Sequence, residues 1–175
     1  FNAATVISQG RQMATYRKQR LPTYEVFDEE RYFQSSETSC VVTFKGTRCG
    51  INICADVWQA GTADQAKVAG AEILLVLNAS PYHIGKQALR AEVVRERIKT
   101  TGLPVVYANL VGGQDELGFD GGSFVLDSHG EVCCQLPKSE EALEVVEIAA
   151  GEPMPGRFAP EQTTESEVYQ ALVLG

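Results

Sequence analysis

The sequence predicts an α/β protein in which helices lie outside two β-sheets. Pairs of strand-like segments flank short turns, as on either side of residues 9–11. The run from Glu72 to Leu77 is almost entirely apolar, as expected for a strand that is covered on both faces. Residues 86–100 place apolar side chains at helical spacing, with charged side chains opposite. Paired strands and strand–helix units together fit an α/β sandwich.

The predicted elements alternate along the chain and are separated by turn residues or helix stops. Residues 62–71 have an Ala-rich helical composition. Gly102 ends the helix over 86–100, and Pro104 opens the next strand. The polar and aromatic loop over 19–38 is expected to be functional, because irregular loops of this length usually are. Strands are predicted at 2–8, 12–18, 40–44, 48–54, 72–77, 105–109, 122–127, 131–136 and 143–149, and helices at 62–71, 86–100 and 163–174.

Length and composition exclude several classes of protein. The 175 residues suffice for one domain with a sizeable core, and 44% hydrophobic with 22% charged residues is typical of a soluble globular chain. The net charge of −8 argues against nucleic-acid binding, because no basic stripe is present to neutralise phosphates. No apolar run reaches the length that a membrane span needs. A protein that handles small molecules fits these properties.

The cysteines and histidines predict neither a disulfide framework nor a metal site. The five cysteines show no CxxC spacing, and Cys133 and Cys134 are adjacent. His83 and His129 lie too far apart for a ligand pair. A reduced, cytoplasmic location is therefore expected, with no bound metal. Gly112-Gly113 and the second glycine pair at 121–122 fit no phosphate-binding motif, so turns or close backbone approaches are expected there.

Cys54 is the strongest candidate for chemistry. It closes a strand-like apolar segment and stands just before a polar turn. At such a turn, a thiol nucleophile and the backbone N–H donors of an oxyanion site can point the same way. The alternative is a buried structural cysteine, which is a common fate of this residue type.

A second candidate is Lys18, which ends an amphipathic strand and enters the long loop. By itself it reads as a solvated loop lysine. However, the segments around Cys54 and Lys18 occur together with three further motifs in one order along the chain. This set resembles the carbon–nitrogen hydrolase (nitrilase) superfamily, and more closely the glutamine amidase domains of glutamine-dependent NAD synthetases. The five segments are 16–33, 47–58, 77–83 with the following Lys86, 111–117 and 119–124.

The resemblance implies a fold and a catalytic set. The fold is the αββα sandwich of the superfamily, and the triad is cysteine, lysine and glutamate. Cys54 would be the nucleophile, and Lys18 would hold positive charge beside the thiolate and the reaction intermediate. The general-base glutamate of the family precedes the Lys18 segment, and no acidic residue here sits in that motif. We therefore expect a partial domain whose N-terminal part is missing, and no ammonia release from glutamine by residues 1–175 alone.

The resemblance also implies residues that bind the substrate. Lys86 would pair with the carboxylate of glutamine, and Ser80 and Tyr24 would fix its orientation. Glu29 resembles a family acidic residue that supports the active site. The alternatives are that Ser80 only forms a turn after a strand, and that Lys86 lies on the surface at a helix N-terminus, where the dipole slightly disfavours a cation.

One residue departs from the family pattern. Where the family usually has an acidic residue directly after the nucleophile, this chain has Ala55. This puts recognition of the substrate ammonium group in doubt. Two alternatives remain for Asp56: it compensates for the missing acid, or it only caps a helix or turn. Trp58 is expected in the core or in a pocket wall.

The resemblance divides the chain into three parts. Residues 1–150 are expected to be the C-terminal portion of the carbon–nitrogen hydrolase domain. Residues 151–162, with three prolines, read as a linker. Residues 163–175 are expected to begin the ATP-dependent NAD synthetase domain, truncated here. ATP and Mg would belong to that further domain, and no cofactor is expected in this stretch.

The expected function is that of the parent enzyme. Its amidase domain hydrolyses L-glutamine and supplies ammonia to the synthetase domain of the same chain, which amidates nicotinic acid adenine dinucleotide to NAD. A homo-oligomer is expected, with no nucleic-acid or membrane partner. Two alternatives stay open: a stand-alone amidase or carbamoylase of the same superfamily, and a non-catalytic scaffold domain with the same fold.

Overall fold

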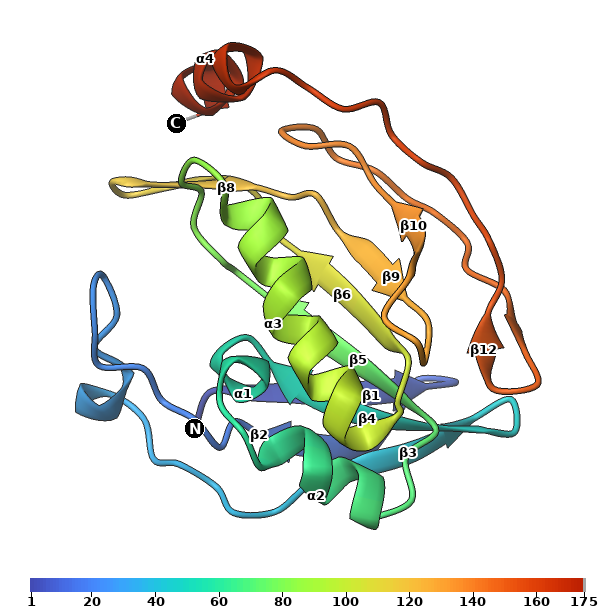
Figure 1. Cartoon of the computed structure of the whole chain (residues 1–175). Coiled ribbons are helices and arrows are strands. Elements are labelled where there is room, and N and C mark those ends of the chain that lie inside the picture. The colour runs from blue at the N-terminus through green and yellow to red at the C-terminus, as the bar shows by residue number, and fades with distance from the viewer. Residues whose placement is uncertain (175) are drawn as a thin grey trace.

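The computed structural model describes residues 1–174, and its centre is a six-stranded sheet (Figure 1). The strand order is β10-β9-β6-β5-β4-β3. The three middle strands run parallel, and the outer strands pair antiparallel with their neighbours. The strands are β3 (Val41–Phe44), β4 (Thr47–Ile53), β5 (Ile73–Asn78), β6 (Val105–Asn109), β9 (Phe124–Leu126) and β10 (Val132–Gln135).

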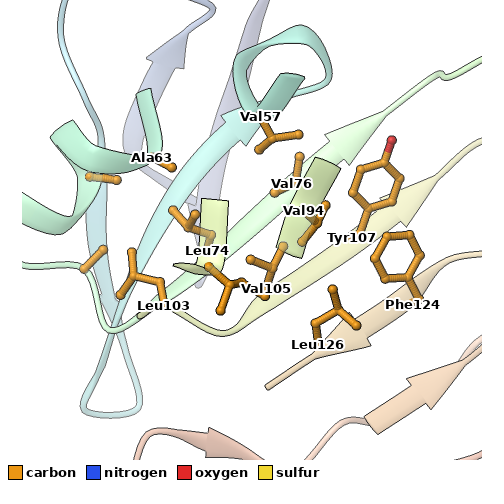
Figure 2. Close-up of a cluster of buried hydrophobic side chains, with 13 residues drawn as sticks. Val57, Ala63, Leu74, Val76, Val94, Leu103, Val105, Tyr107, Phe124 and Leu126 are labelled. Atoms are coloured by element: carbon orange, nitrogen blue, oxygen red, sulfur yellow. The ribbon is translucent and has the colours of Figure 1, made fainter. Parts of the chain in front are cut away.

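Three helices cover one face of this sheet (Figure 1). They are α1 (Ala55–Trp58), α2 (Thr62–Val68) and α3 (Lys86–Thr101). Between them and the sheet lies the main apolar core, shown in Figure 2, to which α3 contributes Val94 and Ile98. Tyr107 of β6 stacks on Phe124 of β9, with 4.7 Å between the ring centroids. Because alternate residues of the parallel strands fill this core, the strand ends beside α1 and α3 are held firmly in place.

Three small hairpins accompany the main sheet. β1 (Ala3–Ser8) pairs with β2 (Arg11–Arg17), β7 (Val111–Gln114) pairs with β8 (Leu117–Asp120), and β11 (Ile148–Ala149) pairs with β12 (Glu152–Pro153). The chain ends in α4 (Thr164–Leu174), which lies beside β8 (Figure 1). Within residues 1–174, none of the helices is both long enough and apolar enough to cross a bilayer.

The predicted α/β class is confirmed, and most element boundaries agree within two residues. The strand predicted over 143–149 is wrong, because only Ile148–Ala149 is a strand. Leu143 and Val145 alternate with glutamates there, but their side chains are 92% and 85% exposed, so no neighbouring strand covers them. The hairpin of β7 and β8 was not predicted, since Gly112 and Gly113 suggested a turn and instead lie within β7.

The predicted linker over 151–162 follows the edge of the sheet. The backbone N–H of Gly156 donates to the carbonyl of Cys133 (2.8 Å), and the N–H of Gln135 donates to the carbonyl of Arg157 (2.9 Å). Beyond it, an ion pair joins Lys138 to Glu167 of α4. The boundaries between amidase, linker and synthetase segments stay predictions, and Gly175 lies outside the described residues.

Candidate active site

Cys54 occupies the tight turn between β4 and α1. Its φ of +43° lies in the region that residues other than glycine rarely adopt. The backbone N–H of Cys54 donates to the carbonyl of Leu77 in β5 (2.9 Å), which fixes the turn against the neighbouring strand. The thiol therefore stands at the carboxyl ends of two parallel strands, where ligands bind in open α/β sheets.

One cavity brings Cys54 together with Lys18 and Glu29. This cavity of about 390 Å³ is called here the amide chamber, and the beginning of β1 also lines it. Lys18 is 1% exposed, and its Nζ donates to Glu29 Oε1 at 2.6 Å. Glu29 Oε2 accepts a further hydrogen bond from the side chain of Asn2 (3.3 Å). Lys18 is thus a buried and paired cation rather than a solvated loop residue.

The surroundings of the thiol act in opposite directions on its acidity. Burial is the largest influence and raises the pKa of Cys54, while the Lys18 ammonium lowers it and the Glu29 carboxylate raises it. Hydrogen bonds from the backbone of Ala79 and Ala55 also lower it. The net pKa is raised, so the thiol needs a proton acceptor before it attacks. The same two N–H groups are suited to stabilise negative charge that develops next to the sulfur.

Asp56 fixes the lysine segment to the cysteine turn. It is fully buried, and its carboxylate accepts hydrogen bonds from the Tyr16 hydroxyl and from three backbone N–H groups. Two of those N–H groups belong to Gln19 and Arg20, which directly follow Lys18; the third belongs to Ile53. The idea that Asp56 compensates for the acid missing at position 55 is therefore wrong, because both oxygens are already engaged inside the protein. Its local bond is to the N–H of Ile53, just before the cysteine turn, and its link to the lysine segment was not anticipated.

A second cavity of about 340 Å³ is also lined by Cys54, and we refer to it as the recognition pocket. It gathers three predicted substrate-binding residues, Tyr24, Ser80 and Lys86, together with Trp58. The Lys86 ammonium lies 4.7 Å from the centroid of the Trp58 ring, so this ring is a pocket wall that supports a cation. Glu29, predicted with these residues, instead lies in the amide chamber beside Lys18.

Arg90 of α3 was not predicted, although it organises the base of the recognition pocket. It is fully buried and bonds Asp120 through two nitrogens, at 2.7 and 3.1 Å. Its Nε donates to the hydroxyl of Ser80 (3.1 Å), and its Nη2 donates to the Ser80 carbonyl (2.8 Å). The signal was present in the sequence: Arg90 continues the buried stripe of Val94 and Ile98 at a spacing of four residues.

The remaining predicted features lie as follows. Gly121 and Gly122 adopt positive φ between β8 and β9, and a Cβ on Gly121 would come within 2.5 Å of Val111 Cγ2. His83 is exposed at the rim of the recognition pocket. No cluster of three or more His, Cys, Asp or Glu side chains in residues 1–174 is arranged to hold a metal ion.

Comparison with known sequences gives a consistent picture. The family model described as Carbon-nitrogen hydrolase matches residues 1–152. The chain is 47% identical over 154 residues to the glutamine-dependent NAD(+) synthetase of Xanthomonas campestris pv. campestris, covering 87% of this chain and 28% of that protein. It is 39% identical over 176 residues to the synthetase of the same description from Acinetobacter baylyi, covering 99% and 32%. The chain thus spans about a third of the length of the curated relatives it matches.

Solved structures agree with the sequence matches. The chain superposes on the glutamine-dependent NAD+ synthetase of Acinetobacter baumannii with a TM-score of 0.94 and 39% identity, covering 99% of this chain and 34% of that one. A carbon–nitrogen hydrolase from Helicobacter pylori G27 gives a TM-score of 0.72 at 25% identity, covering 80% and 54%. The amidase of Nesterenkonia sp. AN1 gives 0.65 at 27% identity, covering 73% and 49%; in that structure acrylamide has added to the active site cysteine.

Proposed function

Because the chain belongs to the carbon–nitrogen hydrolase family, we propose that it is the glutamine-hydrolysing part of a glutamine-dependent NAD synthetase. The observation that carries this proposal is the position of Cys54 between two cavities of different character. The amide chamber holds a buried lysine beside the thiol, while the recognition pocket offers charged and hydroxyl groups to the rest of a substrate. Relatives described as glutamine-dependent NAD(+) synthetases support the choice of glutamine.

The reaction begins with attack of Cys54 Sγ on the carbon of the substrate carboxamide. An S–C bond forms, and the carbonyl oxygen becomes an oxyanion. Lys18 and the N–H groups of Ala55 and Ala79 stabilise this charge. The C–N bond then breaks, and the nitrogen leaves as ammonia after it receives a proton. Water hydrolyses the resulting thioester, which releases glutamate and restores the thiol.

The proton of the thiol must pass to a base and then to the leaving nitrogen. Glu29 is poorly suited to this, because one of its oxygens accepts from Lys18 and the other accepts from Asn2. We assign Glu29 to holding Lys18 in place, and we assign the general base to a glutamate outside residues 1–174, as in the family pattern. Tyr24 and Ser80 orient the substrate in the recognition pocket.

The ammonia serves an ATP-dependent amidation of nicotinic acid adenine dinucleotide to NAD. ATP and Mg act in the synthetase part of the intact protein, of which residues 163–175 would be the beginning. We place the enzyme in the cytoplasm as a homo-oligomer. This proposal fits a chain that spans about a third of the length of the relatives it matches.

The test is the variant Cys54→Ala in the intact protein, assayed for NAD formation with either glutamine or ammonium as the nitrogen source. We expect glutamine-dependent NAD formation to fall at least about a thousandfold, because the nucleophile is lost. Ammonium-dependent formation should be retained. The matched control is Cys40→Ser, which changes a half-buried thiol that lines neither cavity.

Two results would overturn the proposal. Glutamine-dependent activity that survives in the Cys54→Ala variant would remove Cys54 from the reaction. An intact wild-type protein that hydrolyses an amide but makes no NAD from ammonium and ATP would be a stand-alone amidase instead.

A further inference from the structure

The recognition pocket contains two charged side chains of opposite sign that have no ion-pair partner within residues 1–174. Among the described residues that line it, Glu25 is the single carboxylate and Lys86 is the single lysine or arginine. Neither takes part in the ion pairs found within residues 1–174. Charges that face a cavity without a partner are suited to a ligand that brings the opposite charges.

The other acidic residues near the cysteine cannot serve such a ligand. Position 55 is an alanine, so it offers no charge. Asp56 is fully buried with both oxygens engaged, and Glu29 is bound to Lys18 in the amide chamber. Within the described residues, Glu25 is thus the carboxylate that remains for a cation in the recognition pocket.

The backbone at Glu25 supports a functional role for its side chain. Its φ of +56° lies in the left-handed region, where glycine would be the unstrained choice. Strained positions of this kind concentrate at ligand-binding sites. The neighbouring Tyr24 has a raised pKa, caused first by burial and then by the negative charges of Cys54, Glu25 and Glu29. Tyr24 and Glu25 line the same cavity as Cys54.

We propose that Glu25 binds the α-ammonium group of the amino-acid amide whose α-carboxylate is expected at Lys86 in the same pocket. This inference rests on the proposed glutamine hydrolysis and names the residue that selects an α-amino acid over an amide without an amino group. In this chain Glu25 supplies, from the loop after Lys18, the acidic group that position 55 lacks.

The effect of Glu25 should appear in substrate binding. The ammonium group lies several bonds from the carbon that Cys54 attacks, and its charge is the same in the ground state and the transition state. An interaction of this kind is made equally in both states, so its loss raises KM and leaves kcat unchanged.

The experiment compares two substrates in the intact protein and its Glu25→Gln variant. For glutamine, we expect KM to rise about 5- to 20-fold with kcat within twofold, the range of a lost charge-assisted hydrogen bond. For 4-carbamoylbutanoate, which is glutamine without its amino group, kcat/KM should be the same in both proteins. The matched control is Glu30→Gln, an exposed carboxylate that lines neither cavity.

Two further variants separate charge from backbone strain. Glu25→Gly removes the carboxylate and relieves the positive φ, so it should raise the thermal stability of the protein and still raise KM for glutamine. Adding Ala55→Glu to the Glu25→Gln variant should restore the glutamine KM to within about threefold of wild type, because a carboxylate returns to the pocket.

The outcomes are distinguishable from those of the proposed function. A Glu25→Gln variant with an unchanged glutamine KM, or with equal losses for both substrates, would overturn the inference and leave glutamine hydrolysis standing. A wild-type protein that does not hydrolyse glutamine would overturn both. The calorimetric Kd of glutamine for the Cys54→Ala protein, with and without Glu25→Gln, gives the same comparison without turnover; equal Kd values would overturn the inference.

Discussion

The two cavities beside Cys54 differ in how their charges are satisfied. In the amide chamber, Lys18 and Glu29 are bonded to each other at 2.6 Å, and the lysine is almost fully buried. In the recognition pocket, Glu25 and Lys86 face the opening and find no ion-pair partner in the described chain. A neutral carboxamide needs a preorganised cation in a dry site, whereas a zwitterionic head group needs charges that are still free.

Each cavity rests on one buried ionic side chain that ties distant segments together. Below the amide chamber, Asp56 holds the backbone that follows Lys18 against the turn of Cys54. Below the recognition pocket, Arg90 holds the Ser80 turn and pairs with Asp120. Asp56 accepts hydrogen bonds from backbone N–H groups, whereas Arg90 donates to carbonyl and hydroxyl oxygens. Both have the same effect, since they fix a loop to the rigid ends of the parallel strands.

The largest expected effect concerns the support of the recognition pocket. Arg90→Met should destabilise the protein by about 3–5 kcal/mol, because it leaves the buried Asp120 carboxylate without its partner. A urea titration of the intact protein, read out by proteolysis, measures this loss. The control is Arg95→Met on the same helix, where the guanidinium bonds a carbonyl at a partly exposed position. Equal losses in the two variants would show that the buried pair does not hold this region together.

The next effect separates the two cavities by kinetics. Lys18→Met should lower kcat for glutamine hydrolysis about 100- to 1,000-fold, because the cation beside the developing oxyanion is lost. Unlike Glu25→Gln, it should act on kcat more than on KM. The control is Lys99→Met, which removes an exposed lysine paired with Glu96 on α3. A Lys18→Met variant that changes only KM would show that Lys18 binds substrate rather than stabilising the oxyanion. The two cavities would then not differ in their kinetic roles.

The smallest expected effect concerns the pKa of the Cys54 thiol, which lines both cavities. Burial raises the pKa of Cys54 above its ordinary value of 9.0, so the thiolate fraction should still be increasing at that pH. Alkylation of Cys54 by iodoacetamide, followed by mass spectrometry, should accelerate about tenfold per pH unit through pH 9. In the Lys18→Met variant the profile should move to higher pH, because the ammonium lowers the pKa. A plateau below pH 8 would mean that the lysine outweighs burial.

Much of the fold and part of the site follow from local sequence signals. The apolar run of β5 and the helical spacing of α3 depend on short-range patterns, so their boundaries could be predicted. The five segments of the resemblance also contain most of the residues that line the two cavities, although the beginning of β1 lies outside them. Nothing in their spacing, however, showed that Glu29 and Tyr24, five residues apart in one loop, face different cavities.

The long-range polar contacts could not be predicted in this way. Asp56 reads locally as a turn cap, and its bonds to residues 36 and 37 positions earlier depend on how the β1–β2 hairpin packs beside β4. The spacing of Arg90 from Val94 indicates only that it lies on the buried face of its helix; its partner Asp120, 30 residues later, could not be named from the sequence. The β7–β8 hairpin was hidden by its glycines, and of the strand predicted over 143–149 only Ile148–Ala149 finds a strand to pair with.

The backbone of Cys54 has a consequence for protein engineering. At a φ of +43°, the residue that the chain itself favours is glycine, so Cys54→Gly should relax the turn even though it removes the sulfur. A selection for thermal stability alone would therefore favour Cys54→Gly, although this variant has lost the nucleophile. Thermal stability favours glycine at position 54, whereas the proposed chemistry requires cysteine there. A library built to stabilise this protein therefore needs a screen for activity as well as for stability.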